Sequence, residues 1–199
     1  MKKITEKQIV IASHNKGKSD EIAYLLASYP IEVLSAADMN IPDPEETEDT
    51  FVGNALLKAR HCAQRTGLLS LADDSGLVVP AIGGQPGIYS ARWAGLDRDM
   101  GKAIARLEKE LHGVDDASAY FTCALALAWP EHDGEIQTQT FTGHWDGHIA
   151  FPERGQGFGY TPVFVPKGFA ITAAEMPPEQ RYALSGRAKA FKQLVESCF

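Results

Sequence analysis

Short apolar runs and longer amphipathic runs follow one another along the chain. The run from Gln8 to Ala12 is rich in β-branched residues and predicts a strand, and Ile22, Leu25 and Leu26 then recur at helical spacing. The same patterns predict further strands over 31–34, 68–72, 120–129, 136–145 and 163–165, and helices over 51–65, over 100–111, from 172 and over 185–196. Strands interleaved with helices, with a late β-hairpin that turns at 131–134, predict a mixed-sheet α/β fold.

The strand predicted over 68–72 ends at the polar sequence Asp73-Asp74-Ser75-Gly76, and a glycine-rich loop over 83–95 follows. Ligands in open α/β sheets lie at the carboxyl ends of strands, so two carboxylates in this place indicate a metal–phosphate site. The alternative is a turn in which Asp and Ser bond to the backbone. Neighbours on an extended strand point to opposite faces. We therefore expect Asp74 to face the reacting centre and Asp73 to help hold a metal or the loop.

Ser13, Asn15 and Lys18 lie where the first predicted strand passes into the first helix. Free amides at a helix N-terminus attract anions, and these side chains add donors for phosphate oxygens. The spacing is not that of a P-loop. The alternative is an ordinary helix cap followed by solvated lysines.

The segment 38–50 is acidic and contains two prolines, which predicts a loop. Its residues Glu45 and Glu46 either belong to a solvated surface or supply one ligand to Mg²⁺, which takes one or two protein carboxylates and completes its coordination with waters and phosphate oxygens.

Two further segments each allow two interpretations. Phe158 and Tyr160, in the glycine-rich run 155–160, either stack on a planar ring or fill a core beneath a turn. Ser185-Gly186-Arg187 either meets an anion or a base edge, or caps the last helix.

Composition narrows the class of protein. The 199 residues carry a formal net charge of −7, which argues against nonspecific binding to nucleic acid or to an anionic membrane. The three cysteines are far apart and form no Cys-x-x-Cys motif, so we expect reduced thiols in a cytoplasmic protein. No apolar run approaches the length of a membrane span or of a signal peptide.

Taken together, the polar segments resemble a known family over essentially the whole chain. The motifs that carry the resemblance occur in order at 13–18, 46–59, 72–76, 84–95, 157–160, 173–176 and 185–187. The chain resembles the inosine triphosphate pyrophosphatase family, also called Ham1-like or noncanonical purine nucleoside triphosphate pyrophosphatases. The resemblance implies a single domain over 1–199, with an elongated mixed β-sheet, flanking helices and two lobes around a central substrate cleft. It also implies a homodimer.

The implied activity is Mg²⁺-dependent hydrolysis of ITP, dITP or XTP to the monophosphate and pyrophosphate. By resemblance, Glu46 binds metal, Asp74 binds metal or activates water, and Asp73 lies beside them. The resemblance implies that Ser13, Asn15 and Lys18 contact the triphosphate, together with His14, Lys16 and Gly17 of the same segment. It implies that Phe158 stacks on the base, with Gly159, Tyr160 and Thr161 beside it, and that Arg187 contacts the base edge, with Gly186. It also implies substrate contacts for Ser75 and for Arg181, which stands where the family usually has Lys.

Three positions depart from the family pattern. Thr161 stands where an Asp is usual, Gly186 where a His is usual, and Gly53 where a Glu is common. The first two belong to the part that reads the base, whereas the acids and phosphate binders match. Our hypothesis is that hydrolysis is retained while base selectivity is relaxed or shifted. The competing hypothesis is a nucleotide-binding protein with weak or no catalysis.

Overall fold

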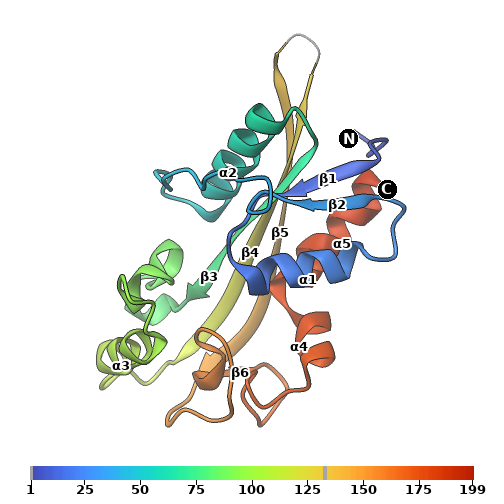
Figure 1. The fold of residues 1–199 in the computed structure, drawn as a ribbon. Helices are drawn as coiled ribbons and strands as arrows, with labels where there is room; N and C mark the ends of the chain where they lie inside the picture. The colour runs from blue at the N-terminus through green and yellow to red at the C-terminus, as the bar shows by residue number, and fades with distance from the viewer. Residues whose placement is uncertain (1, 132–133) are drawn as a thin grey trace. The chain divides into compact units, whose positions relative to one another are not determined.

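The computed structural model describes residues 2–131 and 134–199 (Figure 1). In chain order the elements are β1 (Gln8–Ile11), α1 (Lys16–Leu26), β2 (Glu32–Ser35), α2 (Phe51–Thr66), β3 (Ser70–Val78), α3 (Met100–Glu110), β4 (Ser118–Pro130), β5 (Ile136–Ile149), β6 (Phe164–Pro166), α4 (Pro178–Leu184) and α5 (Gly186–Cys198). Short 3₁₀ helices lie between β3 and α3 and before β6.

The strands form one sheet in the order β2-β1-β3-β4-β5-β6. β1 is parallel to both β2 and β3, whereas β5 is antiparallel to β6. The prediction of an α/β fold with a mixed sheet and flanking helices is therefore confirmed. In the part of the chain that the structure describes, no helix is long and apolar enough to cross a membrane.

The chain divides into two compact units, each with its own core. Unit 1 comprises residues 1–74, 123–143 and 187–199, and unit 2 comprises residues 75–122 and 144–186. The core of unit 2 gathers around Leu77, Leu107, Trp145, Tyr160 and Phe164.

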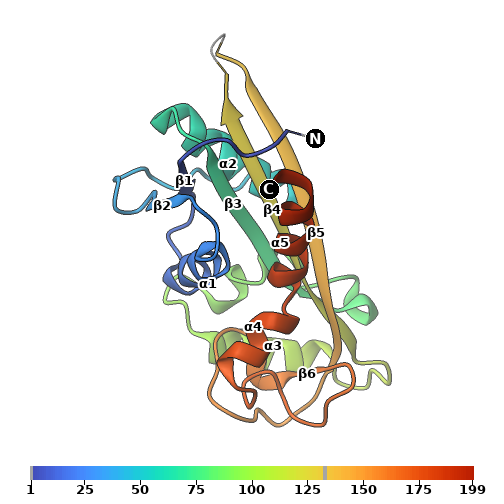
Figure 2. The same ribbon diagram turned by 90° about the vertical axis from the view of Figure 1, so that its right-hand side faces the viewer.

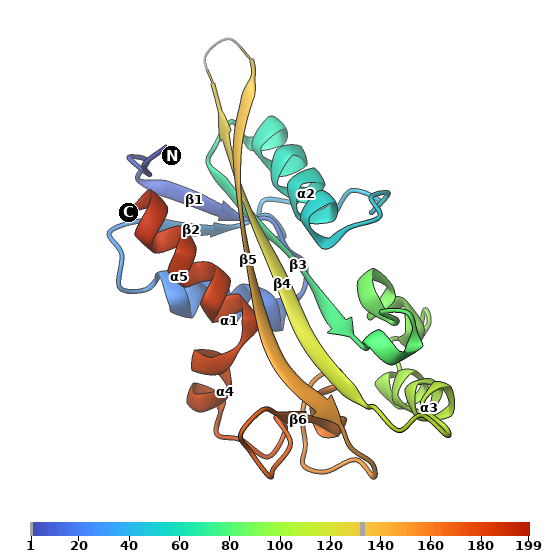
Figure 3. The ribbon, with the colours of Figure 1, turned by 180° about the vertical axis from the view of Figure 1, so that it is seen from behind.

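Unit 1 packs different side chains on the two faces of its sheet because strand residues alternate between faces. Along β4, Leu125, Leu127 and Trp129 join α1 and α5 in one cluster, while the alanines at 124, 126 and 128 join α2 in another. Figures 2 and 3 show α1 and α5 over one face and α2 over the other. The small residues let α2 lie close to the strands.

Helix α2 has clear sequence signals at both ends. The Thr50 side chain accepts a hydrogen bond from the Gly53 backbone amide at 3.0 Å, which caps the first turn. Gly67 ends the helix in the left-handed conformation at φ 67°, which a residue without a side chain adopts at low cost. The helix predicted over 51–65 is confirmed, with one more residue at its end.

Two predicted boundaries are wrong. β3 does not end at Ala72 but continues through both acids to Val78, because the buried carboxylates find partners in neighbouring helices. The helix predicted from Thr172 begins only at Pro178, after Pro177. A proline suits the first position of a helix and disfavours helical backbone in the residue before it. Of the predicted hairpin turn, residues 132–133 lie outside the described residues.

Candidate active site

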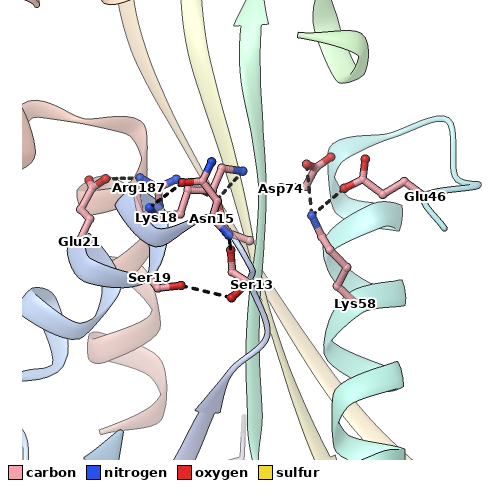
Figure 4. Close-up of polar contacts among 10 residues, drawn as sticks. Ser13, Asn15, Lys18, Ser19, Glu21, Glu46, Lys58, Asp74 and Arg187 are labelled. Carbon is pink, nitrogen blue, oxygen red and sulfur yellow. Dashed lines mark hydrogen bonds and ion pairs between the residues drawn. The ribbon is translucent and has the colours of Figure 1, made fainter. Parts of the chain in front are cut away.

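The segment between β1 and α1 is held by hydrogen bonds among its own residues. Asn15 is the N-cap of α1, and its Oδ1 accepts a hydrogen bond from the Lys18 backbone amide at 3.2 Å. Ser13 Oγ accepts from the Asn15 amide at 3.2 Å, and Ser19 Oγ donates to the Ser13 carbonyl at 3.3 Å (Figure 4). The helix-cap interpretation of Asn15 is therefore confirmed. The role of this segment in binding phosphate stays a prediction.

Two other residues of this segment contact acidic side chains. His14 Nδ1 lies 2.8 Å from Asp43 Oδ1, which connects the segment to the acidic loop. Lys16 makes an exposed pair with Asp20, one turn further along α1.

The two acids of β3 point to opposite sides of the strand. In Figure 4, Asp74 faces Lys58 and Glu46, whereas Lys18 and Arg187 lie on the other side of β3. Asp73 Oδ2 accepts a hydrogen bond from Arg187 Nη2 at 2.8 Å and lies 3.2 Å from Lys18 Nζ. The extended backbone thus separates the two carboxylates, as strand geometry predicts.

Asp73 belongs to a buried cluster of opposite charges. Its side chain is fully buried, and Arg187 also pairs with Glu21 of α1. Burial by itself raises the pKa of Asp73, but the charges of Lys18 and Arg187 outweigh it and hold that pKa well below its ordinary range. The cluster ties α1, β3 and the start of α5 together with Asp73 in its charged form.

Asp74 belongs to a second cluster, on the α2 side. Lys58 Nζ donates to Glu46 Oε1 at 2.8 Å and lies 3.4 Å from Asp74 Oδ1. We call Glu46, Lys58 and Asp74 the acid–lysine centre. It joins the acidic loop, α2 and β3, three segments that are distant in the sequence.

The acid–lysine centre perturbs both of its buried groups. Burial raises the pKa of Asp74 above its ordinary value, and the nearby Lys58 charge only partly opposes this shift. Burial disfavours the charged form of Lys58, but Asp74, Asp73 and Glu46 together raise its pKa. A carboxylate whose pKa is shifted upward toward neutrality is better matched to proton transfer than an ordinary aspartate.

The donor set fits Mg²⁺ as an open site. Within residues 2–131 and 134–199, no three His, Cys, Asp or Glu side chains form a closed metal cage. In the same residues, the buried Oδ2 of Asp74 has no hydrogen-bond partner, although buried carboxylate oxygens normally have one. Mg²⁺ takes one or two protein carboxylates and keeps waters and phosphate oxygens as its other ligands. Glu46 and Asp74 are therefore the residues that could hold the metal.

The structure does not bring Asp73 to this pair of carboxylates. Its Oδ2 is bound by Arg187 and Lys18 on the opposite side of β3. Asp73 was expected to hold a metal or the loop; in the structure it holds Lys18 of α1 and Arg187 of α5. The metal-binding function stays a prediction.

Three residues around the site were not among the predicted site residues: Glu21 and Lys58 of these clusters, and Asn54, which binds the backbone of Glu48 in the acidic loop. All three are buried polar residues on helices. Asn54 and Lys58 are spaced i, i+4 on the face of α2 that otherwise carries Ala55, Ala59, Cys62 and Ala63. A charged or amide side chain in an apolar helix face needs a partner, so this pattern could have indicated them.

The remaining predicted residues lie in unit 2, which is described by itself. Phe158 is 69% exposed, whereas Tyr160 is buried and its hydroxyl donates to the Ser90 carbonyl at 3.0 Å. The prediction that an aromatic residue of this run fills a core is therefore confirmed for Tyr160, whereas the exposed Phe158 does not fill one. Thr161 Oγ1 donates to the Phe158 carbonyl at 2.7 Å, and Gly159 between them has φ 65°.

Three more predicted residues occupy helices or strands of unit 2. Ser75 lies in β3 and is half-buried. The Arg181 guanidinium lies 5.6 Å from the Tyr182 ring centre in α4. Gly186 is buried at the start of α5.

Fold and site together define a mixed-sheet α/β protein with a buried acid–lysine centre and a helix N-terminus, features suited to a metal-bound phosphate substrate. The family model described as the Ham1 family matches residues 9–197, and the chain belongs to this family. It is similar to a dITP/XTP pyrophosphatase of Rhodospirillum centenum, with 54% identity covering 96% of this chain and 94% of the relative. A dITP/XTP pyrophosphatase of Caulobacter vibrioides is 49% identical, covering 96% of this chain and 98% of the relative.

Solved structures agree with this assignment. A HAM1 protein from Coxiella burnetii superposes with a TM-score of 0.87 at 39% identity, covering 96% of this chain and 98% of that one. The Ham1 protein of Staphylococcus aureus gives a TM-score of 0.85 at 35% identity, covering 96% and 97%.

The Asp73 cluster generates a prediction about stability. Because the folded pKa of Asp73 is depressed, its contribution to stability is complete above the unfolded value of about 3.9 and is lost as the pH falls further. We expect Asp73→Asn to lower the free energy of unfolding at neutral pH by about 3–5 kcal/mol, because it removes the buried carboxylate that pairs with both Arg187 and Lys18. Urea unfolding of wild type and of Asp73→Asn, from neutral to acid pH, measures the free energy of unfolding of each.

The matched control is Asp115→Asn, which removes an exposed carboxylate. The difference in free energy of unfolding between wild type and Asp73→Asn should narrow below about pH 4, because the Asp73 carboxyl of the unfolded wild-type chain then begins to protonate. A difference that stays constant over the whole pH range would contradict the charged state assigned to Asp73.

Proposed function

We propose that this chain hydrolyses noncanonical purine nucleoside triphosphates, namely dITP, XTP and ITP, to the monophosphate and pyrophosphate. Such a reaction removes these nucleotides from the pool available for nucleic-acid synthesis. Membership of the Ham1 family and two relatives named as dITP/XTP pyrophosphatases support the proposal. The observation that carries it is the acid–lysine centre, in which the buried Asp74 has a raised pKa and an oxygen without a partner among the described residues.

In this proposal Mg²⁺ is the cofactor, held by Glu46 and Asp74. When bound, it neutralises charge on the phosphate oxygens and lowers the pKa of a coordinated water. Lys58 pairs with both carboxylates and partly offsets their negative charge. Ser13, Asn15 and Lys18 bind the triphosphate at the N-terminus of α1, where backbone amides favour negative charge.

The chemistry breaks the anhydride bond between the α- and β-phosphates. Asp74 orients a water and accepts its proton, the water oxygen bonds to phosphorus, and pyrophosphate leaves. Most of the rate enhancement of phosphoryl transfer comes from positioning and electrostatic stabilisation. Positioning and electrostatic stabilisation are provided by side chains that ion pairs hold in place. Lys58 pairs with Asp74 and with Glu46, and Lys18 pairs with Asp73.

The proposal assigns recognition of the base to the residues that the family resemblance implies, among them Arg187. Phe158 stacks on the purine, and Ser75, Thr161, Arg181 and Gly186 contribute contacts. The 69% exposure of Phe158 leaves its ring accessible, which is compatible with stacking on a planar base. A homodimer and a cytoplasmic location belong to the same proposal and rest on the family resemblance and on the cysteine content.

The first test removes the charge of Asp74. We expect Asp74→Asn to lower pyrophosphate release by about 10²–10⁴-fold, the usual contribution of a general base. Because the folded pKa of Asp74 is raised, its ionised form opposes folding at neutral pH, so the variant should be no less stable than wild type.

Pyrophosphate release from dITP with Mg²⁺ and the melting temperature are measured together, with Asp115→Asn as the control. Full activity in Asp74→Asn would remove Asp74 from the chemistry. Tight binding of dITP by wild type without pyrophosphate release would instead favour the alternative of a nucleotide-binding protein.

The second test addresses base selectivity. Thr161 and Gly186 stand where the family has charged or ring-bearing base readers, so we expect a weaker discrimination against GTP and ATP than a site with fixed polar readers gives. The comparison is kcat/KM for XTP, ITP, GTP and ATP in wild type and in Thr161→Asp combined with Gly186→His. We expect the double variant to be the more selective protein. A sharply selective wild type that the two substitutions leave unchanged would contradict this hypothesis.

A further inference from the structure

Glu46 lies in a loop that helix α2 holds at two points. The acidic loop, residues 38–50, contains no helix or strand. Its first attachment to α2 is the ion pair between Glu46 and Lys58. Its second attachment is made two residues later, at the backbone of Glu48.

The second attachment is a two-way pairing with the side chain of Asn54. Asn54 Oδ1 accepts a hydrogen bond from the Glu48 backbone amide at 3.1 Å, and Asn54 Nδ2 donates to the Glu48 carbonyl at 3.3 Å. The Asn54 side chain is fully buried. It therefore satisfies both backbone groups of one loop residue, as a neighbouring strand would.

Gly53 makes room for this pairing. A Cβ atom at position 53 would lie 2.7 Å from Glu48 Cβ and 3.1 Å from Glu48 Cγ. Both distances are shorter than ordinary contacts between carbon atoms. Glu48 can lie against the first turn of α2 only because residue 53 has no side chain.

The pairing also determines where Glu46 can reach. Asn54 and Lys58 are one helical turn apart and share a face of α2. The Glu46 side chain is 30% exposed, and a partly exposed ion pair contributes little by itself to the order of a loop. The attachment at Glu48 is therefore a further restraint, two residues away, on the position of Glu46 relative to Lys58 and Asp74.

We propose that Asn54 and Gly53 form a clamp on Glu48, and that this Glu48 clamp positions Glu46 as a ligand for the divalent cation. Asn54 is thus a positioning residue that acts through Glu46. The assignment of Glu46 as a metal ligand rests on the proposed function; the contacts of the clamp do not. Outer partners that orient a metal ligand typically affect metal affinity by about 10–100-fold.

The test compares Asn54→Ala and Gly53→Ala with the matched control Thr50→Ala. Thr50→Ala removes the cap of the same helix turn but leaves the Asn54–Glu48 hydrogen bonds intact. Two quantities are measured without substrate: Mn²⁺ binding by electron paramagnetic resonance, and exchange of the Glu48 amide hydrogen. Pyrophosphate release from dITP is measured separately.

We expect Asn54→Ala to weaken Mn²⁺ binding by about tenfold or more and to accelerate exchange of the Glu48 amide. Gly53→Ala should also weaken Mn²⁺ binding. Because alanine favours a helix more than glycine does, the melting temperature of this variant should not fall to a corresponding extent. Thr50→Ala should lower the melting temperature and leave Mn²⁺ binding unchanged.

Folded Asn54→Ala that binds Mn²⁺ like wild type would overturn the proposal, and so would equal weakening in Thr50→Ala. If Asn54→Ala does not fold, Gly53→Ala decides by the same two readouts. Wild type that binds no Mn²⁺ would also overturn the function of the clamp. Wild type that binds Mn²⁺ but releases no pyrophosphate from dITP or XTP would refute the proposed function alone.

Discussion

The extended backbone of β3 at Asp73 and Asp74 is the constraint on which the site depends. An extended strand directs adjacent side chains to opposite faces, so the two carboxylates enter different surroundings. Asp73 meets Lys18 and Arg187, and its pKa is driven down. Asp74 is buried as well, but there the charges of Lys58 and Lys18 do not outweigh burial, and its pKa is raised. Two adjacent aspartates therefore have pKa values shifted in opposite directions.

Each carboxylate also fixes helices around the strand. The buried Asp73 cluster joins α1 and α5 to one side of β3, and the acid–lysine centre joins α2 and the acidic loop to the other. Buried charges are costly unless they are paired, so these helices cannot shift without exposing an unpaired ion. The chain has a net charge of −7, yet it gathers three cations at this point of the sheet. Each of these cations is paired with at least one carboxylate, from Glu21, Glu46, Asp73 or Asp74.

Much of the fold could be predicted because its signals are local. The β-branched run at 8–12, the helical spacing after it and Gly67 at the end of α2 depend only on neighbouring residues. The end of β3 could not be predicted in this way. A run of polar residues normally ends a buried strand, but here Lys58 and Arg187, from two distant helices, supply the partners that keep it buried.

Only part of the site could be predicted, because some of its residues are identified by tertiary contacts alone. Glu46 and Asp74 both contact Lys58, and only the family resemblance had implied that the two acids belong together. Lys58 was missed because its role depends on tertiary contacts. Phe158 and Tyr160 have similar aromatic side chains in one glycine-rich run. Only the packing of unit 2 decides that Tyr160 is buried while Phe158 is exposed.

The central claim is that Glu46 and Asp74, and not Asp73, form the metal–phosphate centre. A crystal structure of the protein with Mn²⁺ and a non-hydrolysable dITP analogue tests it most directly, because the anomalous scattering of Mn²⁺ locates the metal independently of any assumption. The account predicts an anomalous peak at coordination distance from Glu46 and Asp74 and from a phosphate oxygen, with Asp73 still bound to Arg187. A peak coordinated by Asp73, or one remote from both Glu46 and Asp74, would contradict it.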